Sequence, residues 1–417
     1  MVDLPGEAFA LGVASGEPDH ESVVLWTRLL GNVPDSLEIV WELAADQAMT
    51  PLVATGLVTV GVDSAHSVRV IADGLDPDQR FFYRFRAGSL TSPTGSTRTL
   101  PTLDDPRALT LGVSSCQARS DGAWAAHRDM AESDVDVVLW LGDYIYGDNR
   151  TLGEQRAAYV EYRSDPLIQA CHAAHPWISF IDDHEVANDF DASIDPARRA
   201  AALQAWWEHQ PTRLPPPDAD GALAVHRAFD LGGVARLIGL DVRQYANDIS
   251  LLGASQWSFV ERAAAHNLAN TLIASPVIMS GLRDLDGEPL VPYSIDARPD
   301  ERVRMADLLA AAPQPTIVSG DLHTSLVADF SADPLDPGIP SVAVEIMAPA
   351  ISSAFPTRFA ALAPFLPLVN PQLRDVDVSN GWLELTLSKT GRTAAFHYVD
   401  TITDPASPIT IRPIPNL

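Results

Sequence analysis

Apolar and polar residues alternate with a period of two through much of the first hundred residues, which is the pattern of half-buried β-strands. The alternation is clearest between Leu37 and Leu43 and between Phe81 and Phe85, where charged residues separate apolar positions. Further strands are predicted at residues 22–29, 52–60 and 67–71. We predict a small β-sandwich over residues 1–101 and a linker at residues 101–106.

From residue 108 onward the rhythm changes to short apolar strands separated by longer amphipathic or alanine-rich stretches. This alternation is typical of layered α/β structure, which we predict for residues 107–417. A hairpin is expected at residues 382–399, with its turn at residues 389–391. Strands are predicted at residues 109–113, 135–141, 177–181, 234–240, 272–278, 316–318 and 341–346, and helices at residues 154–173, 197–209, 255–267 and 301–311.

Composition narrows the range of partners. The chain has 417 residues, enough for two or three domains, and a formal net charge of -27 from 28 basic and 55 acidic residues. This charge argues against nucleic acid or an anionic membrane as a standing partner. The sequence contains no run of 18 apolar residues, so no membrane span is predicted. The first residues lack the pattern of a leader peptide, although a leader that has been removed would leave no trace. The oligomeric state stays open.

The stretch IDDHEVAND, residues 181–189, places four acidic residues around the single histidine His184. Two carboxylates about 4 Å apart repel by about 4 kcal/mol near a protein surface, and a bound cation removes that cost. A solvated acidic loop is the alternative. A zinc-protease helix is excluded because Asn188 stands where the second histidine would be, and an EF-hand loop is excluded because residues 182–195 contain no glycine.

Potential metal ligands follow four of the predicted strands. Cys116 follows strand 109–113, Asp143 and Tyr146 follow strand 135–141, residues 182–185 follow strand 177–181, and Asp321 and His323 follow strand 316–318. Taken singly, each has an ordinary interpretation, such as a buried small thiol or a turn cap. Sites in α/β sheets assemble at the carboxyl ends of strands, so these groups can converge. The mixture of donors predicts a polynuclear metal site.

Ordered motifs along nearly the whole chain resemble the alkaline phosphatase D (PhoD-like) family of the calcineurin-type metallophosphatase superfamily. They are FALGVASGEP, SVVLWTRL, SSCQ, LGDYIYG, HPWISFIDDHEVAND, LDVRQY, VSGDLHTS and EIMAPAISS. The resemblance implies a four-layer α/β/β/α catalytic domain preceded by a sandwich, which the fibronectin-like corner at residues 75–77 also suggests. It further implies a site that holds Fe³⁺ and Ca²⁺, with other divalent metals as alternatives.

The resemblance also implies roles for individual residues. Asp143 corresponds to the bridging carboxylate, and Asp183 and Asp321 correspond to ligands of calcium. Asn188 is a further candidate calcium ligand. The residues expected on the iron side are Cys116, Tyr146 and His323. Asp182, Glu185 and Asp189 are expected either to orient the ligands or to be solvated, and we favour the orienting role for Glu185.

The implied activity is hydrolysis of small phosphate esters, and the first expectation is an alkaline phosphomonoesterase. A metal-bound hydroxide would attack phosphorus while the metals offset charge on the phosphoryl oxygens. His184 is the candidate proton donor and Arg243 the candidate oxyanion or support residue, although a structural hydrogen bond and a buried ion pair are the alternatives. Phosphodiesterase or phospholipase D-type activity is the second expectation, and a non-catalytic binding protein the third.

Two further expectations come with the resemblance. Ala246 stands where the family continues the RQY motif with a basic residue, and a tryptophan common before the VSGD strand is absent, so the substrate pocket is expected to differ. The family also implies a periplasmic or secreted protein after removal of a leader, whereas a chain without a leader would be cytoplasmic.

Overall fold

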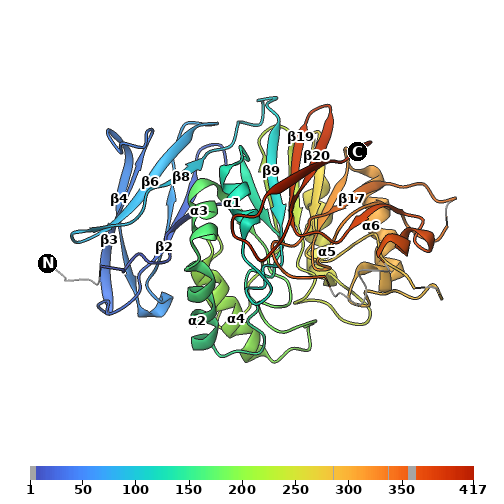
Figure 1. Ribbon diagram of the computed structural model, residues 1–417, viewed down its shortest axis with the longest axis horizontal. Helices are drawn as coiled ribbons and strands as arrows, with labels where there is room; N and C mark the ends of the chain where they lie inside the picture. Colours follow the sequence, from blue (N-terminus) through green and yellow to red (C-terminus); the bar gives the residue numbers. More distant parts are fainter. Residues whose placement is uncertain (1–5, 285, 337, 356–362) are drawn as a thin grey trace.

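Two β-sheets stacked face to face form the centre of the molecule (Figure 1). The computed structural model describes residues 6–284, 286–336, 338–355 and 363–417. Within these residues the first sheet has nine strands. In spatial order they are β21 (Ile409–Pro413), β20 (Gly391–Val399), β19 (Gly381–Ser388), β9 (Leu109–Ser114), β10 (Val137–Trp140), β11 (Pro176–Ser179), β1 (Val13–Gly16), β2 (Val23–Arg28) and β5 (Ser67–Ala72).

The second sheet has seven strands among the described residues, and its central strands run parallel. In spatial order they are β12 (Arg227–Leu231), β13 (Ala235–Gly239), β14 (Asn270–Ala274), β15 (Thr316–Ser319), β17 (Ala343–Met347), β16 (Ser325–Phe330) and β18 (Leu373–Asp377). Strands β9, β10 and β11 of the first sheet are also mutually parallel. Parallel neighbours end at the same edge of a sheet, so the loops that follow them lie together.

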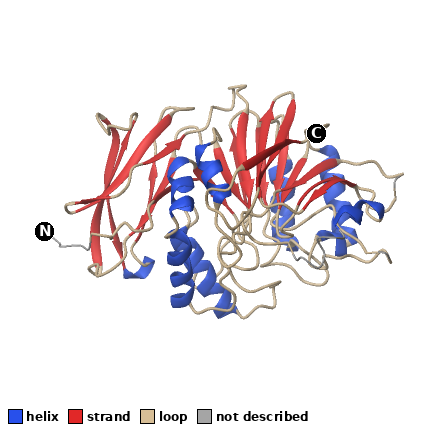
Figure 2. Ribbon diagram, viewed as in Figure 1, coloured by secondary structure: helices blue, strands red, loops and turns tan. Residues whose placement is uncertain are grey.

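Helices cover the outer faces of both sheets, which gives the predicted four layers (Figure 2). One set packs on β10 and β11 through a shared apolar cluster, and the other packs on β13, β14 and β15. The first set is α1 (Ala125–Glu132), α2 (Leu152–Arg163), α3 (Pro166–Ala174) and α4 (Pro196–His209), and the second is α5 (Gly253–Ala264) and α6 (Pro299–Ala311). The α/β/β/α prediction is confirmed.

A continuous apolar layer joins the inner faces of the two sheets. Leu111 of β9 and Leu139 of β10 are fully buried there with Leu272 of β14 and Ile346 of β17. Full burial of one such side chain contributes about 1.5–3 kcal/mol. This layer fixes the strand ends of one sheet relative to those of the other.

The N-terminal sandwich shares a sheet with the rest of the molecule. Strands β1, β2 and β5 form one of its layers, and β1 pairs in parallel with β11 of the α/β region. The other layer consists of β4 (Leu52–Gly61), β3 (Ser36–Ala44), β6 (Arg80–Ala87), β7 (Leu90–Thr91) and β8 (Gly95–Arg98). The boundary between residues 101 and 107 stays a prediction, and residues 1–5 of the predicted sandwich lie outside the described part.

One predicted helix was wrong in its extent. Residues 154–173 form two helices, α2 and α3, because Pro166 cannot continue the hydrogen-bonding pattern of α2. Asp165 caps the new helix by accepting a hydrogen bond from the backbone nitrogen of Leu167 at 2.8 Å. The hairpin of β19 and β20 was predicted correctly, whereas β1, β7, β8, α1, β12, β16, β18 and β21 had no prediction.

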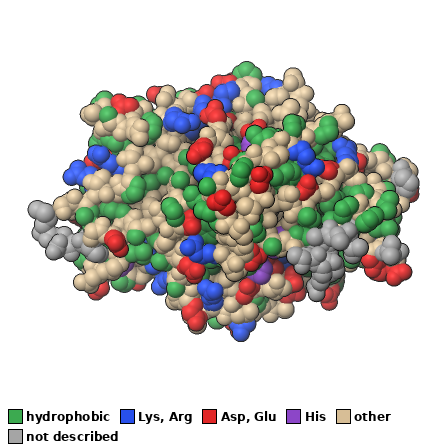
Figure 3. All heavy atoms as spheres, viewed as in Figure 1, with side chains coloured by type: hydrophobic (Ala, Val, Ile, Leu, Met, Phe, Trp, Pro, Cys, Tyr) green, Lys and Arg blue, Asp and Glu red, His purple; other side chains and the backbone are tan. Residues whose placement is uncertain are grey.

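The surface and the helices add two facts about partners. On the face shown in Figure 3, basic side chains lie scattered among acidic ones rather than gathered in one patch. Among the described helices, none combines the length and apolar character that crossing a membrane requires.

The helix layer contains a fully buried histidine whose protonation is coupled to folding. His127 donates one hydrogen bond from Nε2 to Oε1 of Gln117 and packs against Trp124, Trp140 and Trp177. Burial lowers the pKa of His127 to about 3. An unfolded histidine has a pKa of about 6.5, so below that pH the unfolded chain takes up a proton that the folded chain refuses.

We therefore expect His127 to make the protein less stable in acid. Between pH 7.5 and 5 it should lower the free energy of unfolding by about 2 kcal/mol. In a His127→Gln variant that loss should disappear, while His20→Gln, at an exposed position, should behave as the parent. Urea unfolding of chelator-treated proteins at both pH values measures the difference. Equal losses in both variants would refute the coupling.

Candidate metal centre

The predicted ligands converge where loops leave the carboxyl ends of neighbouring strands. Cys116 lies two residues after β9, Asp143 three residues after β10, Asp183 four residues after β11 and Asp321 two residues after β15. The first three strands are adjacent in one sheet, and β15 belongs to the sheet that faces it. The stacking of the sheets thus brings together groups separated by some 200 residues of sequence.

Left-handed backbone conformations mark four of these positions. Cys116, Asp143, Asp321 and His323 have φ of 54°, 56°, 73° and 52°. Such conformations cost a non-glycine residue about 1–2 kcal/mol each and persist where surrounding structure enforces them. Gly142 has φ of 113°, and a Cβ there would lie 2.5 Å from the backbone nitrogen of Asp182. The sharp turns aim the side chains of the four residues into one region.

Potential ligand atoms form three overlapping groups, each with its atoms within 4.8 Å of one another. Asp143 belongs to two of the groups and Asp183 to two. A shared carboxylate is what two adjacent cations require. The groups are Cys116, Asp143 and His323; Asp143, Asp183 and His184; and Asp182, Asp183 and Asp321.

Tyr146 lies beside the first group. Its hydroxyl is 3.2 Å from Nε2 of His323 and 2.5 Å from the hydroxyl of Ser353. A thiol, a phenol, an imidazole and a carboxylate therefore surround one position, whereas carboxylates predominate at the other. The potential donors at the two positions therefore differ in softness.

Buried negative charge exceeds positive charge in this region. Arg243 is the basic side chain in direct contact: its Nε donates to Asp182 Oδ1 at 2.5 Å, and its Nη2 lies 3.5 Å from Asp183 and 3.4 Å from Asp321. Burial, followed by the charge of Asp183, raises the pKa of Asp143 well above its usual range. Oδ2 of Asp182 and Oδ1 of Asp183 are buried without a hydrogen-bond partner among the described residues.

This arrangement fits bound cations. An unpartnered carboxylate oxygen in a protein interior costs several kcal/mol of lost hydration unless a donor or a cation faces it. One carboxylate oxygen of Asp182 and one of Asp183 are in this position, and several carboxylates surround one arginine. Bound cations would satisfy these oxygens. The centre has the donors and the charge to hold metal ions.

Glu185 ties the two ligand loops together. Its carboxylate accepts hydrogen bonds from the backbone nitrogens of Asp143 at 3.1 Å, Tyr144 at 2.5 Å and Asp182 at 2.9 Å. Burial raises the pKa of Glu185 to about 7 even though these three donors oppose the rise. Glu185 thus holds the loop after β10 against the loop after β11, and it belongs to none of the three ligand groups.

His184 is held by a residue that the sequence analysis missed. Its Nδ1 lies 2.8 Å from Oδ2 of Asp148, and its ring stacks on Tyr146 with centroids 4.1 Å apart. Burial disfavours the imidazolium, but the hydrogen bond to Asp148 and the nearby carboxylates prevail and raise the pKa of His184 to about 9. The available signal was a second aspartate five residues after Asp143, in GDYIYGD.

Two other predicted residues are members of none of the three ligand groups. Asn188 is exposed, and its side-chain amide donates to Asp189 Oδ2 at 2.7 Å, so its role as a calcium ligand stays a prediction. Arg243 is buried among the carboxylates, with its guanidinium 4.6 Å from the ring centroid of Tyr293. Tyr293, which no motif indicated, donates to Asp321 Oδ2 at 3.0 Å.

Comparison with known proteins places this geometry among phosphatases. A family model described as PhoD-like phosphatase matches residues 111–373, and one for the N-terminal domain of PhoD-like phosphatases matches residues 3–101. Alkaline phosphatase D of Bacillus subtilis (strain 168) is 32% identical over 385 residues. That match covers 78% of this chain and 66% of the relative, so the chain spans just under two thirds of the relative's length.

Solved structures agree with the fold. A structure described as that of PhoD superimposes with a TM-score of 0.93 at 27% identity, covering 100% of this chain and 94% of the other. Purple acid phosphatase PPD1 from yellow lupin (Lupinus luteus) seeds superimposes with a TM-score of 0.66 at 10% identity, covering 93% and 71%. At that identity the lupin protein shares the fold alone.

The geometry predicts which substitutions remove bound metal. Asp321→Asn replaces a charged ligand of the carboxylate-rich position with a neutral amide, and should lower the metal content of protein purified without chelators by about one ion per chain. Elemental analysis by mass spectrometry measures the content. Asp104→Asn, at an exposed position in the linker, is the control and should retain the parent content. Equal content in parent and Asp321→Asn would remove Asp321 from the ligand set.

Proposed function

The chain belongs to the PhoD-like phosphatase family, and on this basis we propose that it hydrolyses phosphate esters at a two-metal centre, with monoesters preferred. Membership in the family confirms the resemblance drawn from the sequence motifs. The observation that carries the proposal is that Asp143 belongs to two adjacent groups of potential metal ligands, one with Cys116 and His323 and one with Asp183 and His184. Two cations a few ångströms apart form the standard clamp for in-line displacement at phosphorus.

The donors suggest a different metal at each position. Cys116, Tyr146, Asp143 and His323 suit Fe³⁺, since thiolate, phenolate and imidazole are borderline or strongly basic donors. Asp143, Asp183 and Asp321 suit Ca²⁺, which prefers carboxylate oxygens in a flexible arrangement. Asn188 could add a carbonyl oxygen after a side-chain rotation away from Asp189. Both metal identities are part of this proposal.

The bound cations would supply Lewis acidity, which lowers the pKa of a water and offsets charge on the phosphoryl oxygens. The remaining work belongs to side chains. Asp148 holds Nδ1 of His184, so the proton on the opposite nitrogen, Nε2, is available to the leaving oxygen. Arg243 is buried and bonded to carboxylates, which supports a role in holding Asp182 and Asp321 rather than in contacting substrate.

Small phosphate esters are the proposed substrates. The matched family and the Bacillus relative are both described as phosphatases, which supports monoester hydrolysis over the phosphodiesterase or phospholipase D-type alternative. A complete set of donors at both positions speaks against a protein that only binds its ligand. The net charge of -27 disfavours extended polyanions as substrates.

A leaving-group comparison tests the role of His184. If His184 protonates the leaving oxygen, His184→Gln should lower kcat for an alkyl phosphate by about 10²–10⁴-fold. The same variant should affect 4-nitrophenyl phosphate far less, because 4-nitrophenolate leaves without a proton. His66→Gln, in the N-terminal sandwich, is the matched control.

The outcomes distinguish a catalytic role of His184 from a structural role. Equal losses on both esters, with unchanged metal content, would show that His184 acts structurally. Absence of phosphate release from either ester by the metal-loaded parent enzyme would overturn the proposed function itself.

A further inference from the structure

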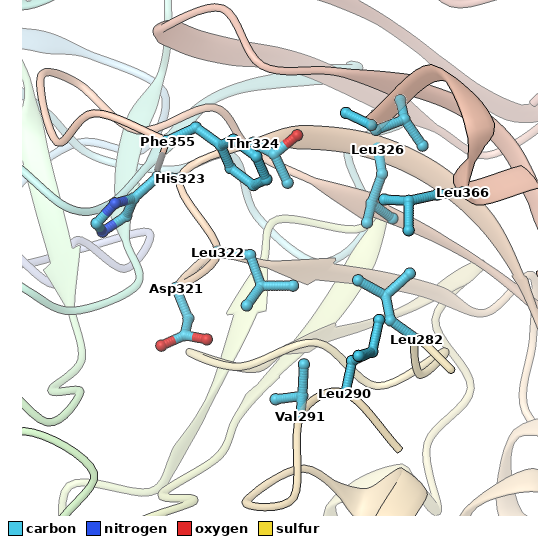
Figure 4. Close-up of a pocket in the computed structure, with 12 residues that line it drawn as sticks. Leu282, Leu290, Val291, Asp321, Leu322, His323, Thr324, Leu326, Phe355 and Leu366 are labelled. Atoms are coloured by element: carbon cyan, nitrogen blue, oxygen red, sulfur yellow. The ribbon is translucent and has the colours of Figure 1, made fainter. Parts of the chain in front are cut away.

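A cavity of about 490 Å³ opens directly beside the metal centre (Figure 4). It lies between β16, β18, the loop after β14 and the 3-10 segment η3 (Ala363–Leu368). Asp321 and His323 stand at one end of the cavity, and leucines occupy the other. Its described lining is Leu282, Leu290, Val291, Asp321, Leu322, His323, Thr324, Leu326, Phe355, Ala363, Leu366 and Val376.

We propose that this cavity binds an alkyl chain, so that the preferred substrates are monoesters of phosphate with apolar alcohols. The inference rests on the proposed function and specifies its substrate class. Ligand pockets usually enclose about 300–1,000 Å³, and this one is large enough for a chain of several methylenes.

The described lining offers few partners to polar substituents. Apart from the metal-facing Asp321 and His323, its polar side chain is Thr324, whose hydroxyl already donates to the backbone oxygen of Asp377 at 2.7 Å. No arginine or lysine occurs among the described lining residues. Among the described lining residues a sugar hydroxyl, a nucleobase or a second phosphate would find few partners to replace its hydration, whereas an alkyl chain loses nothing.

The turn at residues 321–323 connects the two environments. Asp321 and His323 face the metal centre, and Leu322 between them contributes to the cavity wall (Figure 4). Both flanking residues have positive φ, which produces the turn that separates their side chains from that of Leu322. A phosphoryl group near Asp321 and His323 can direct its ester substituent past Leu322 toward Leu326 and Leu366.

Exposed apolar side chains occur on the elements that line the cavity. Leu290 lines it while remaining 49% exposed, and η3, which contributes Leu366, also carries Phe365 and Leu368 at 60% and 79% exposure. Large apolar side chains at such exposure become covered when an apolar ligand binds next to them. A chain longer than the cavity would continue along these residues.

A homologous series of alkyl phosphates tests the inference. For monoesters from ethyl to octyl phosphate, used below the concentrations at which they form micelles, kcat/KM should rise about three- to fourfold per methylene until the cavity is filled. Phosphate release measures the rate. A flat series with measurable turnover would overturn the inference and leave the proposed function standing.

A pair of substitutions locates the effect. Leu290→Gln combined with Leu366→Gln places two amides at the cavity wall and should lower the octyl-to-ethyl ratio of kcat/KM at least tenfold. Leu103→Gln, at a leucine 54% exposed in the linker, should keep the parent ratio. An unchanged ratio in the double variant would show that the chain binds elsewhere.

Binding of phosphonates separates this inference from the proposed function. Octylphosphonate and ethylphosphonate, which are not hydrolysed, can be titrated calorimetrically into the parent and double-variant proteins. If the parent binds octylphosphonate more tightly than ethylphosphonate and the double variant reduces that difference, the cavity proposal is supported. This holds even if no ester is hydrolysed, because the lack of hydrolysis would overturn only the proposed phosphatase activity. Equal affinities for the two phosphonates in the parent would overturn the cavity proposal.

Discussion

Mutual repulsion among buried carboxylates is the constraint around which this molecule is organised. Asp143, Asp182, Asp183 and Asp321 lie within a few ångströms of one another, and among the described residues the positive charges that face them are those of Arg243 and of the imidazolium of His184. Each pair of such charges costs several kcal/mol at the effective dielectric of a protein. Cations relieve that cost, and without them protonation must do so. The sheets, the turns and Glu185 therefore act against an electrostatic force that would separate the ligand loops.

Rigidity against that force comes from packing far from the charges. The apolar layer between the two sheets fixes the ends of β9, β10 and β15, from which the ligand loops leave. Pairing of β1 with β11 extends the same sheet into the N-terminal sandwich, so the strand that precedes IDDHEVAND is flanked on both sides. Left-handed conformations at the ligand positions can persist because the backbone on either side is anchored.

Local patterns predicted an α/β layered arrangement and one topological rule predicted that the potential ligands converge, whereas the number of layers was implied by the family resemblance. Short apolar strands mark the sheets, and strand ends in parallel sheets collect functional groups. Two contacts over long separations were not predicted: Tyr293 reaches Asp321, and Asp148 holds His184. An orienting role for Glu185 was expected, but no periodic signal indicates the backbone nitrogen that it binds in the loop after β10. The helix break at Pro166 was readable in principle, whereas β1 was hidden because four buried residues have no alternation.

The abrupt change from charge to apolar surface at residues 321–323 links the two sites physically. Coulomb interactions strengthen as water and other polarisable groups are removed, so an apolar wall beside Asp321 and His323 makes charges at the centre act more strongly on a bound phosphoryl group. An alkyl chain that fills the cavity expels further water from the same side. Substrate shape and electrostatic stabilisation thereby become coupled: the ester that fits the cavity also creates the drier surroundings in which its own charge is best stabilised.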